Sequence, residues 1–161
     1  MHSRSAEIIS CLPYSHPFLF VDELTEVNEN GITGSYTFLK NSFFYEGHFK
    51  KNPVTPGVIL TECMAQIGVV CLGIFLFSSE GTKTQISNFK IGLSSTEIDF
   101  YKPVFPGDKV TVVSEKEYFR FNKLKCHVQM FDDEGELICR GKIAGMVKPD
   151  NNDQKGRVDR I

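Results

Sequence analysis

The sequence predicts an α+β fold in which a curved antiparallel sheet wraps around one long helix. Two observations lead to this prediction. Several segments alternate polar and apolar residues with a period of two, which is typical of half-buried antiparallel strands. One segment, Gly57–Phe77, is apolar on nearly every side and too long for a strand, which indicates a helix buried on most sides. Since no other segment is apolar enough to cover this helix, we expect a sheet of roughly five or six strands to curl around it.

The alternation is clearest in three segments, at 32–38, 124–130 and 137–147. The first two have an apolar face opposite a polar one, and the third keeps one small or apolar face, so each is predicted to be a strand. Turn-forming residues stand at two places, 28–31 and 132–135. Both end in a glycine, which can adopt the positive φ that a hairpin turn often needs. We therefore expect hairpins there.

The long helix is predicted to begin after Pro56, because proline suits the start of a helix. The alternative is a transmembrane span, since 21 residues would cross a hydrocarbon core of roughly 30 Å. However, Glu62 and Gln66 lie within the segment, and an acid in the middle of a membrane costs about 2–3 kcal/mol. The predicted strands also need a helix to pack against. We therefore expect a core helix and no membrane insertion.

Composition narrows the class of protein. The chain has 161 residues, 41% of them hydrophobic and 24% charged, which is ordinary for a soluble protein. One domain is expected over residues 1–148, followed by a polar and flexible tail at 149–161. A net charge of -2 gives no general affinity for nucleic acid. The N-terminus lacks the apolar stretch of a signal peptide, so we expect a cytoplasmic protein.

The five cysteines form no Cys-x-x-Cys pair and have no metal-ligand spacing. Four of them lie in apolar or alternating segments. We expect these to be small buried side chains in a reducing compartment, and we predict no metal site.

The candidate chemistry lies between residues 45 and 66, YEGHFKKNPVTPGVILTECMAQ. His48 stands in a short polar loop, and neutral imidazole is a competent base near pH 7. Glu62 stands in the second turn of the predicted helix, with Gln66 on the same face. Apolar residues at positions 58, 59, 63 and 67 are expected to wall this carboxyl. Partial loss of solvent favours the protonated acid, which can then donate a proton.

The start of the helix adds a third element. The backbone N–H groups of Gly57 and Val58 have no partner within the helix and carry partial positive charge, so they can bind a developing oxyanion. A base, an acid and an oxyanion site suit the elimination of water. The base removes the proton next to a carbonyl, and the acid protonates the departing β-hydroxyl. This reaction needs no metal and no organic cofactor.

Each residue taken alone also has a structural explanation. His48 could be an ordinary loop residue, Glu62 could pair with a lysine, and the glycine before the helix could simply punctuate a turn. The combined order Gly-His-Phe, proline-bounded turn, Glu-x-Met-Ala-Gln favours function.

The sequence resembles the FabZ-type 3-hydroxyacyl-[acyl-carrier-protein] dehydratases over roughly residues 12–147. Three stretches carry the resemblance: LPYSHPFLFVD at 12–22, GHFKKNPVTPGVILTECMAQ at 47–66 and FYKPVFPGD at 100–108. The middle stretch is the most specific, because His48 and Glu62 keep the separation of 14 positions that the family's catalytic pair has.

The resemblance implies a hot-dog fold, in which a curved sheet wraps a central helix. It also implies a homodimer with a shared sheet, sometimes assembled further into a trimer of dimers. Each active site would take His48 from one subunit as the base and Glu62 from the other as the acid or water-orienting group. The Gly57 amide would bind the thioester carbonyl, with Val58 and Gln66 also expected at the substrate. Acyl carrier protein would deliver the substrate on its phosphopantetheine arm, and no cofactor is implied.

Several positions depart from the family pattern. Lys50-Lys51-Asn52 replaces the common Pro-Gly-Arg, and Thr55 stands where methionine is usual. Tyr14 and His16 invert the usual order, and two residues are inserted around 91–96. The departures leave acyl chain length and pathway open, from general fatty-acid synthesis to a specialised lipid or polyene pathway. Lys50 and Lys51 also suggest a contact with the acidic carrier protein, although a merely solvated loop explains them equally well.

Two other functions are compatible with this fold. The first is an acyl-CoA thioesterase, which also uses a helix carboxylate but does not need a histidine at position 48. The second is a non-catalytic acyl-binding protein, which would not need both His48 and Glu62.

Overall fold

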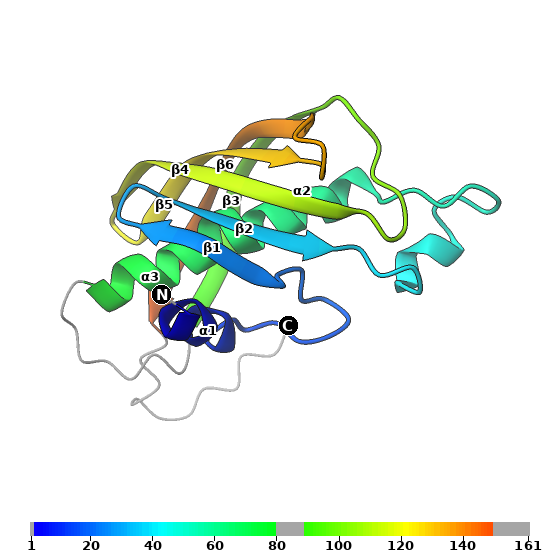
Figure 1. Ribbon diagram of the computed structural model, residues 1–161. Helices are drawn as coiled ribbons and strands as arrows, with labels where there is room; N and C mark the ends of the chain where they lie inside the picture. Colours follow the sequence, from blue (N-terminus) through cyan, green and yellow to red (C-terminus); the bar gives the residue numbers. More distant parts are fainter. Residues whose placement is uncertain (1, 80–88, 150–161) are drawn as a thin grey trace, which may run out of the picture.

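The protein is described here by a computed structural model that covers residues 2–79 and 89–149. One six-stranded sheet, antiparallel throughout, curls around a central helix (Figure 1). Its strand order is β1-β2-β4-β5-β6-β3. The bounds are β1 Glu23–Asn28, β2 Gly31–Thr37, β3 Phe89–Phe100, β4 Lys109–Arg120, β5 Lys123–Phe131 and β6 Leu137–Pro149. The predicted α+β architecture is thereby confirmed.

The three strands that alternation locates are β2, β5 and β6, and each matches its prediction to within two residues at either end. The hairpin turns lie where glycine and its neighbours predict them, between β1 and β2 and between β5 and β6. Gly135 has a φ of 82°, as the prediction for the second turn requires. The predicted tail at 149–161 falls outside the described residues except for Pro149, which ends β6.

Strand β3 holds the segment in which two inserted residues are expected. Its pairing with β6 shifts register between Leu93 and Ser95, so one extra residue is accommodated there as a β-bulge. Within residues 2–79 and 89–149, β3 pairs on one side only, with β6, and so forms an edge of the sheet. Most of its side chains are exposed, including Leu93 and Phe100.

The central helix runs without interruption from Gly57 to Ser79, close to its predicted bounds. It is not regular, because α2 (Gly57–Ala65) and α3 (Leu72–Ser79) are joined by a π-helical segment, η2 (Gln66–Cys71). The Ser114 hydroxyl of β4 donates a hydrogen bond of 2.9 Å to the carbonyl oxygen of Gly68. A side chain in place of this glycine would lie 3.0 Å from the Ser114 Cβ atom. The π-helical turns thus lie where the helix packs closely against β4.

By length and composition this helix could cross a membrane, with a mean hydropathy of 2.0 over its most apolar window. However, 83% of that window is buried inside the protein, because the sheet wraps around it (Figure 1). Its burial is that of a core helix, as predicted.

The core fills the space between the helix and the concave face of the sheet. Four cysteines belong to it, at positions 63, 71, 126 and 139, and Cys11 is half-buried. All five are free thiols. Burial raises the pKa of the Cys63 and Cys71 thiols, so both remain protonated and act as packing groups. The prediction that these cysteines are small buried side chains is confirmed.

A short N-terminal helix, α1 (His2–Ser10), was not predicted. It buries Ile8, and its Arg4 guanidinium lies 4.4 Å from the centre of the Phe75 ring and donates a hydrogen bond to the Ser79 hydroxyl. Helix α1 therefore packs against the C-terminal end of the central helix. The opposite end of that helix, where α2 begins, carries the candidate catalytic groups.

Candidate active site

His48 lies in the loop between a 3₁₀ turn, η1 (Phe43–Glu46), and helix α2. Backbone hydrogen bonds tie this loop together. The N–H of Val54 donates to the carbonyl oxygen of His48 at 2.9 Å, and Phe49 and Asn52 each donate to the other's carbonyl at 3.3 Å. The Phe49 ring stacks on the imidazole, with 4.1 Å between the ring centres. The loop therefore holds the histidine on a fixed backbone.

The hydrogen bond of the imidazole determines which ring nitrogen can act as a base. The Nδ1 atom of His48 lies 2.8 Å from the carbonyl oxygen of Val54. A carbonyl oxygen can only accept, so Nδ1 carries the proton. In neutral imidazole the other nitrogen, Nε2, then has a free lone pair. His48 is thus held in the tautomer that a general base needs.

Glu62 lies in the second turn of α2 and is half-buried. Its Oε1 atom accepts a hydrogen bond of 2.9 Å from the side-chain amide of Gln66. Within the described part of the chain, no hydrogen bond to Oε2 is seen. Gln66 itself is completely buried. It also contacts the segment before β1, through the backbone of Phe18 and Phe20.

The expected wall around Glu62 is only partly present. Ile59, Cys63 and Ile67 are buried, but the side chain of Val58 is 76% exposed. Val58 belongs to the first turn of α2 and faces outward, whereas Ile59 and Leu60 in the same turn are buried. The expectation that Val58 walls the carboxyl is therefore wrong for the single chain.

Tyr14 is a neighbour of Glu62 that sequence reasoning did not assign to the site. Burial, together with the negative charge of Glu62, raises the pKa of Tyr14 to about 12. The phenol is therefore neutral at physiological pH and packs against the core. The only signal in the sequence was the unusual order of Tyr14 and His16 in the segment 12–22.

The start of α2 provides the predicted N–H groups. The first amides with an acceptor in the helix are those of Ile59 and Leu60, which both donate to the carbonyl oxygen of Pro56. The amides of Gly57 and Val58 precede them and point out of the helix end. A side chain at Gly57 would lie 3.3 Å from the ring of Phe100, at the end of β3, so the glycine lets this ring lie close to the start of the helix.

A buried polar contact fixes the approach to the helix. Thr55, one of the departures from the family pattern, is buried and its hydroxyl lies 2.6 Å from that of Tyr45. Its N–H donates to the carbonyl oxygen of Val104, in the loop between β3 and β4. Lys50 and Lys51, in contrast, are exposed at the tip of the His48 loop.

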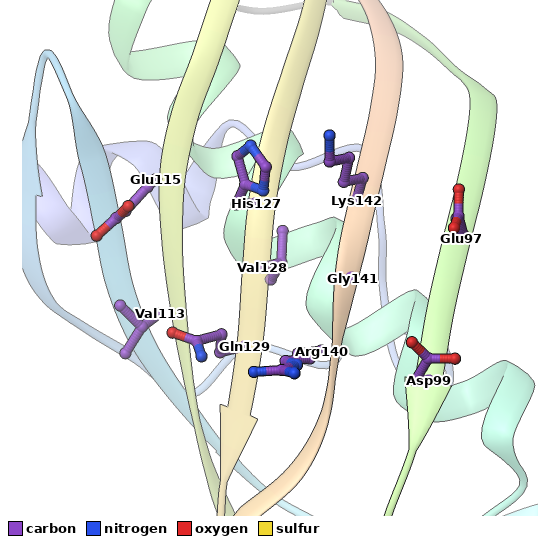
Figure 2. A pocket seen from close by; sticks show the side chains of 10 residues that line it. All are labelled: Glu97, Asp99, Val113, Glu115, His127, Val128, Gln129, Arg140, Gly141 and Lys142. Carbon is purple, nitrogen blue, oxygen red and sulfur yellow. The ribbon is translucent and has the colours of Figure 1, made fainter.

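Two other polar groupings include none of these residues. A hollow of about 390 Å³ on the outer face of the sheet is lined by charged side chains of β3 to β6 (Figure 2). Its opposite charges are cross-strand neighbours, Glu97 with Lys142 and Asp99 with Arg140, so they compensate one another. The carboxylates of Asp132, Glu134 and Glu136 also gather in the β5–β6 turn. The Lys102 ammonium bonds to Asp132 and Glu136 and supplies a positive charge there.

Comparison with known proteins decides the family. A family model described as a FabA-like domain matches residues 12–148. The chain is 36% identical over 154 residues to a protein of Ehrlichia ruminantium (strain Welgevonden) named 3-hydroxyacyl-[acyl-carrier-protein] dehydratase FabZ, covering 92% of this chain and 99% of that relative. The chain belongs to the FabZ-type dehydratase family. FabZ of Ehrlichia chaffeensis is 34% identical over 152 residues, covering 92% of this chain and 97% of that protein.

Other FabZ-type relatives come from other bacteria. The FabZ of Caldicellulosiruptor saccharolyticus is 34% identical over 146 residues, which cover 88% of this chain and 96% of the relative. The match over the whole FabZ-type domain confirms the resemblance that the segments at 12–22, 47–66 and 100–108 indicate.

Solved structures confirm the hot-dog architecture. A dehydratase heterocomplex, ApeI:P from Xenorhabdus doucetiae, aligns with a TM-score of 0.68 at 11% identity, over 89% of this chain and 91% of that chain. A hypothetical thioesterase with coenzyme A from Streptococcus pneumoniae aligns with a TM-score of 0.55 at 13% identity, over 79% of this chain and 85% of that chain. At such identities the likeness concerns the fold, so the thioesterase likeness gives no argument for hydrolysis by this FabZ-type chain.

Proposed function

We propose that this protein removes water from 3-hydroxyacyl thioesters carried by acyl carrier protein and forms trans-2-enoyl thioesters. Membership of the FabZ-type family supports this reaction. The residues proposed to perform it are His48 and Glu62, with the amides of Gly57 and Val58 at the thioester oxygen.

His48 performs the first half of the reaction. Its Nε2 atom removes a proton from the carbon next to the thioester carbonyl, and the electron pair of that C–H bond moves toward the carbonyl carbon. Negative charge develops on the thioester oxygen, where the amides at the start of α2 stabilise it. The Val54 carbonyl oxygen keeps its hydrogen bond to Nδ1–H and so stabilises the imidazolium that forms.

Glu62 performs the second half of the reaction. Its Oε2 atom gives a proton to the hydroxyl on the β carbon, the C–O bond breaks, and water leaves as the double bond forms. After one turnover His48 is protonated and Glu62 is ionised, so one proton must pass through solvent to restore the starting state. Within the elimination itself the protons balance, because His48 takes up one proton and Glu62 supplies one.

The observation that carries the proposal is the hydrogen bond between His48 and Val54. A loop histidine with a merely structural role could use either nitrogen. Here Nδ1 is committed to the backbone, which leaves Nε2 as the basic atom.

We further propose that the active enzyme is a dimer whose subunits join through β3. Strand β3 is 12 residues long, and such an edge is a template for pairing with another strand. Apolar side chains around it are exposed in the single chain, with 59% for Leu93, 48% for Phe100 and 76% for Val58. A second copy would cover them and bring its Glu62 toward the His48 loop. We also propose that three such dimers assemble into a trimer of dimers.

We propose acyl carrier protein as the partner and the cytoplasm as the location, with Lys50 and Lys51 as a contact surface for this acidic protein. A competing cationic surface exists at the β4–β5 turn, at the other end of the sheet (Figure 1). There Arg120 is exposed, Lys123 is half-buried, and Phe121 is 92% exposed.

Charge reversal tests which of these two surfaces contacts the acyl carrier protein. Replacing Lys50 and Lys51 by glutamate should raise the KM for acyl carrier protein several-fold at low salt, with little change in kcat. The matched control replaces Arg120 and Lys123 by glutamate. A rise in KM confined to the control would place the carrier protein at the β4–β5 turn and contradict the proposed contact.

The reaction itself is tested with 3-hydroxybutyryl and crotonyl thioesters on acyl carrier protein. We expect the protein to interconvert the two thioesters. The reaction is monitored through the absorbance of the enoyl thioester. Release of free thiol would instead indicate a thioesterase. Binding of the acyl carrier protein without turnover of either substrate would indicate a non-catalytic acyl-binding protein.

A further inference from the structure

Gln66 is the polar residue that the structure buries most completely in the central helix, with an exposed fraction of 0%. All polar atoms of its side chain have partners. The Oε1 atom accepts a hydrogen bond of 2.8 Å from the N–H of Phe20. The Nε2 atom lies 3.0 Å from the carbonyl oxygen of Phe18 and 2.9 Å from Oε1 of Glu62.

These partners fix the orientation of the amide. The N–H of Phe20 can only donate, so the oxygen of Gln66 must face it. The NH₂ group must then face Phe18 and Glu62. Its two hydrogens match the two acceptors, and both are used.

The fixed amide has a consequence for Glu62. Its Oε1 atom must act as an acceptor, because Nε2 of Gln66 has only hydrogens to offer. When Glu62 is protonated, the proton therefore belongs on the other oxygen, Oε2. That oxygen has no hydrogen-bond partner among the described residues and is left for a substrate.

We propose that Gln66 is a positioning residue that reserves Oε2 of Glu62 for the substrate hydroxyl. This inference rests on the proposed dehydration. It replaces the expectation that Gln66 binds substrate, since a residue with no exposed surface does not reach one. The anchor of Gln66 is the segment 18–20, so the segment before β1 helps to orient the acid on α2.

The kinetic test compares Gln66→Met and Gln66→Glu with the wild type. Methionine has a similar length and no N–H, so kcat should fall about tenfold to a hundredfold, as for a misplaced catalytic group. The KM for the acyl substrate should stay within about twofold, because Gln66 makes no contact with it. A rise in KM with unchanged kcat would restore a substrate-binding role and overturn the proposal.

The Gln66→Glu variant adds a pH readout. While the new carboxyl is protonated, it can accept from the Phe20 N–H and donate its O–H to Glu62. At low pH the activity of the variant should therefore approach that of the wild type at the same pH. The ratio of the two activities should fall steeply as the new carboxyl ionises. The same low activity at every pH, equal to that of Gln66→Met, would contradict the positioning role.

Ser114→Ala is the matched control for a general disturbance of the helix. It removes the buried hydrogen bond to Gly68 in the same π-helical segment and leaves Glu62 untouched. Its thermal midpoint should fall while kcat is retained. If Gln66→Met behaves in the same way, with a lower midpoint and normal kcat, Gln66 has only a structural role.

A spectroscopic test does not depend on turnover. The two Nε2 protons of Gln66 should give separate ¹H–¹⁵N resonances, assigned through their loss in Gln66→Met. In Glu62→Ala, one of the two should shift strongly while the one bound to Phe18 remains in place. If both resonances are unchanged, Gln66 does not hold Glu62, whatever reaction the protein catalyses. Failure of the proposed function would instead appear as a wild-type protein without dehydratase activity.

Discussion

The Nδ1 atom of His48 lies 2.8 Å from the carbonyl oxygen of Val54, six residues further along the same loop. A second bond, from the N–H of Val54 to the carbonyl oxygen of His48, makes the two residues a reciprocal pair. The pair couples the shape of the loop to the tautomer of the imidazole. The separate contributions of loop and base can therefore be tested with two substitutions.

His48→Asn should keep the loop and lose the base. The asparagine amide can still donate to the Val54 carbonyl, but it has no basic nitrogen. We expect turnover to fall by about 10²–10⁴-fold, the usual contribution of a general base, with a thermal midpoint close to that of the wild type. His48→Ala should lose both activity and some stability. Unchanged turnover in either variant would remove His48 from the mechanism.

Glu62→Gln tests the acid. The substitution keeps the size of the side chain and an acceptor for Gln66, but the amide cannot protonate a leaving hydroxyl. Turnover should fall by about 10²–10⁴-fold at all pH values. Glu62→Asp retains the carboxyl but withdraws it by one methylene, so it should retain more activity than Glu62→Gln. Equal activity of Glu62→Gln and the wild type would argue against this role.

The ion pair of Lys102 with Asp132 should give the fold a pH dependence that is separate from catalysis. Hydrogen bonds from Lys102 and from the amides of Glu136 and Glu134 hold the pKa of Asp132 below its usual 3.8. A lowered folded-state pKa stabilises the protein above the usual value and loses this effect as the pH falls through the lower one. The bonds to Asp132 and Glu136 raise the pKa of Lys102 above its usual 10.5, so its contribution is lost only at high pH.

Thermal melts at several pH values test this. Asp132→Asn should lower the thermal midpoint by a few degrees at neutral pH, and the difference from the wild type should vanish in strong acid. The exposed neighbour substitution Asp133→Asn is the control and should change little. A deficit in Asp132→Asn that persists at the lowest pH would show that the aspartate acts through something other than its charge.

The proposed β3 interface predicts an effect of charge on assembly. Leu93 is 59% exposed at the edge of the sheet, and Leu93→Lys would place a charge on the surface that a second copy should cover. We expect this variant to run as a monomer in sedimentation and to lose activity even though His48 and Glu62 are intact. The control Phe121→Ser changes an exposed apolar residue far from that edge and should leave the mass unchanged. An unaltered mass in both variants would contradict an interface through β3.

Much of the fold follows from simple patterns in the sequence. Alternation locates β2, β5 and β6, and the apolar run at 57–77 locates the central helix, because these segments bury one face or nearly every face in a single chain. Strand β3 shows little alternation, since most of its side chains are exposed in the single chain. The π-helical segment also escaped prediction. It coincides with a hydrogen bond from Ser114, which is 46 residues away in sequence.

The candidate site, like the fold, has parts that the sequence predicts and parts that it does not. His48, Glu62 and Gly57 could be proposed as site residues from the sequence because all three lie in one short segment. The role of Gln66 could not, because its partners Phe18 and Phe20 lie nearly fifty residues earlier in the chain. A buried glutamine in an apolar helix did signal that some backbone partner must exist.

The most direct test of the account asks whether His48 and Glu62 of different subunits form one site. His48→Ala and Glu62→Gln chains are produced together with different tags, and mixed dimers are isolated through both tags. In a mixed dimer one site lacks both groups and the other has both, so its activity should be about half that of the wild-type dimer. Mixed dimers as inactive as either parent variant would contradict a shared site, because they would show that both groups must belong to the same chain.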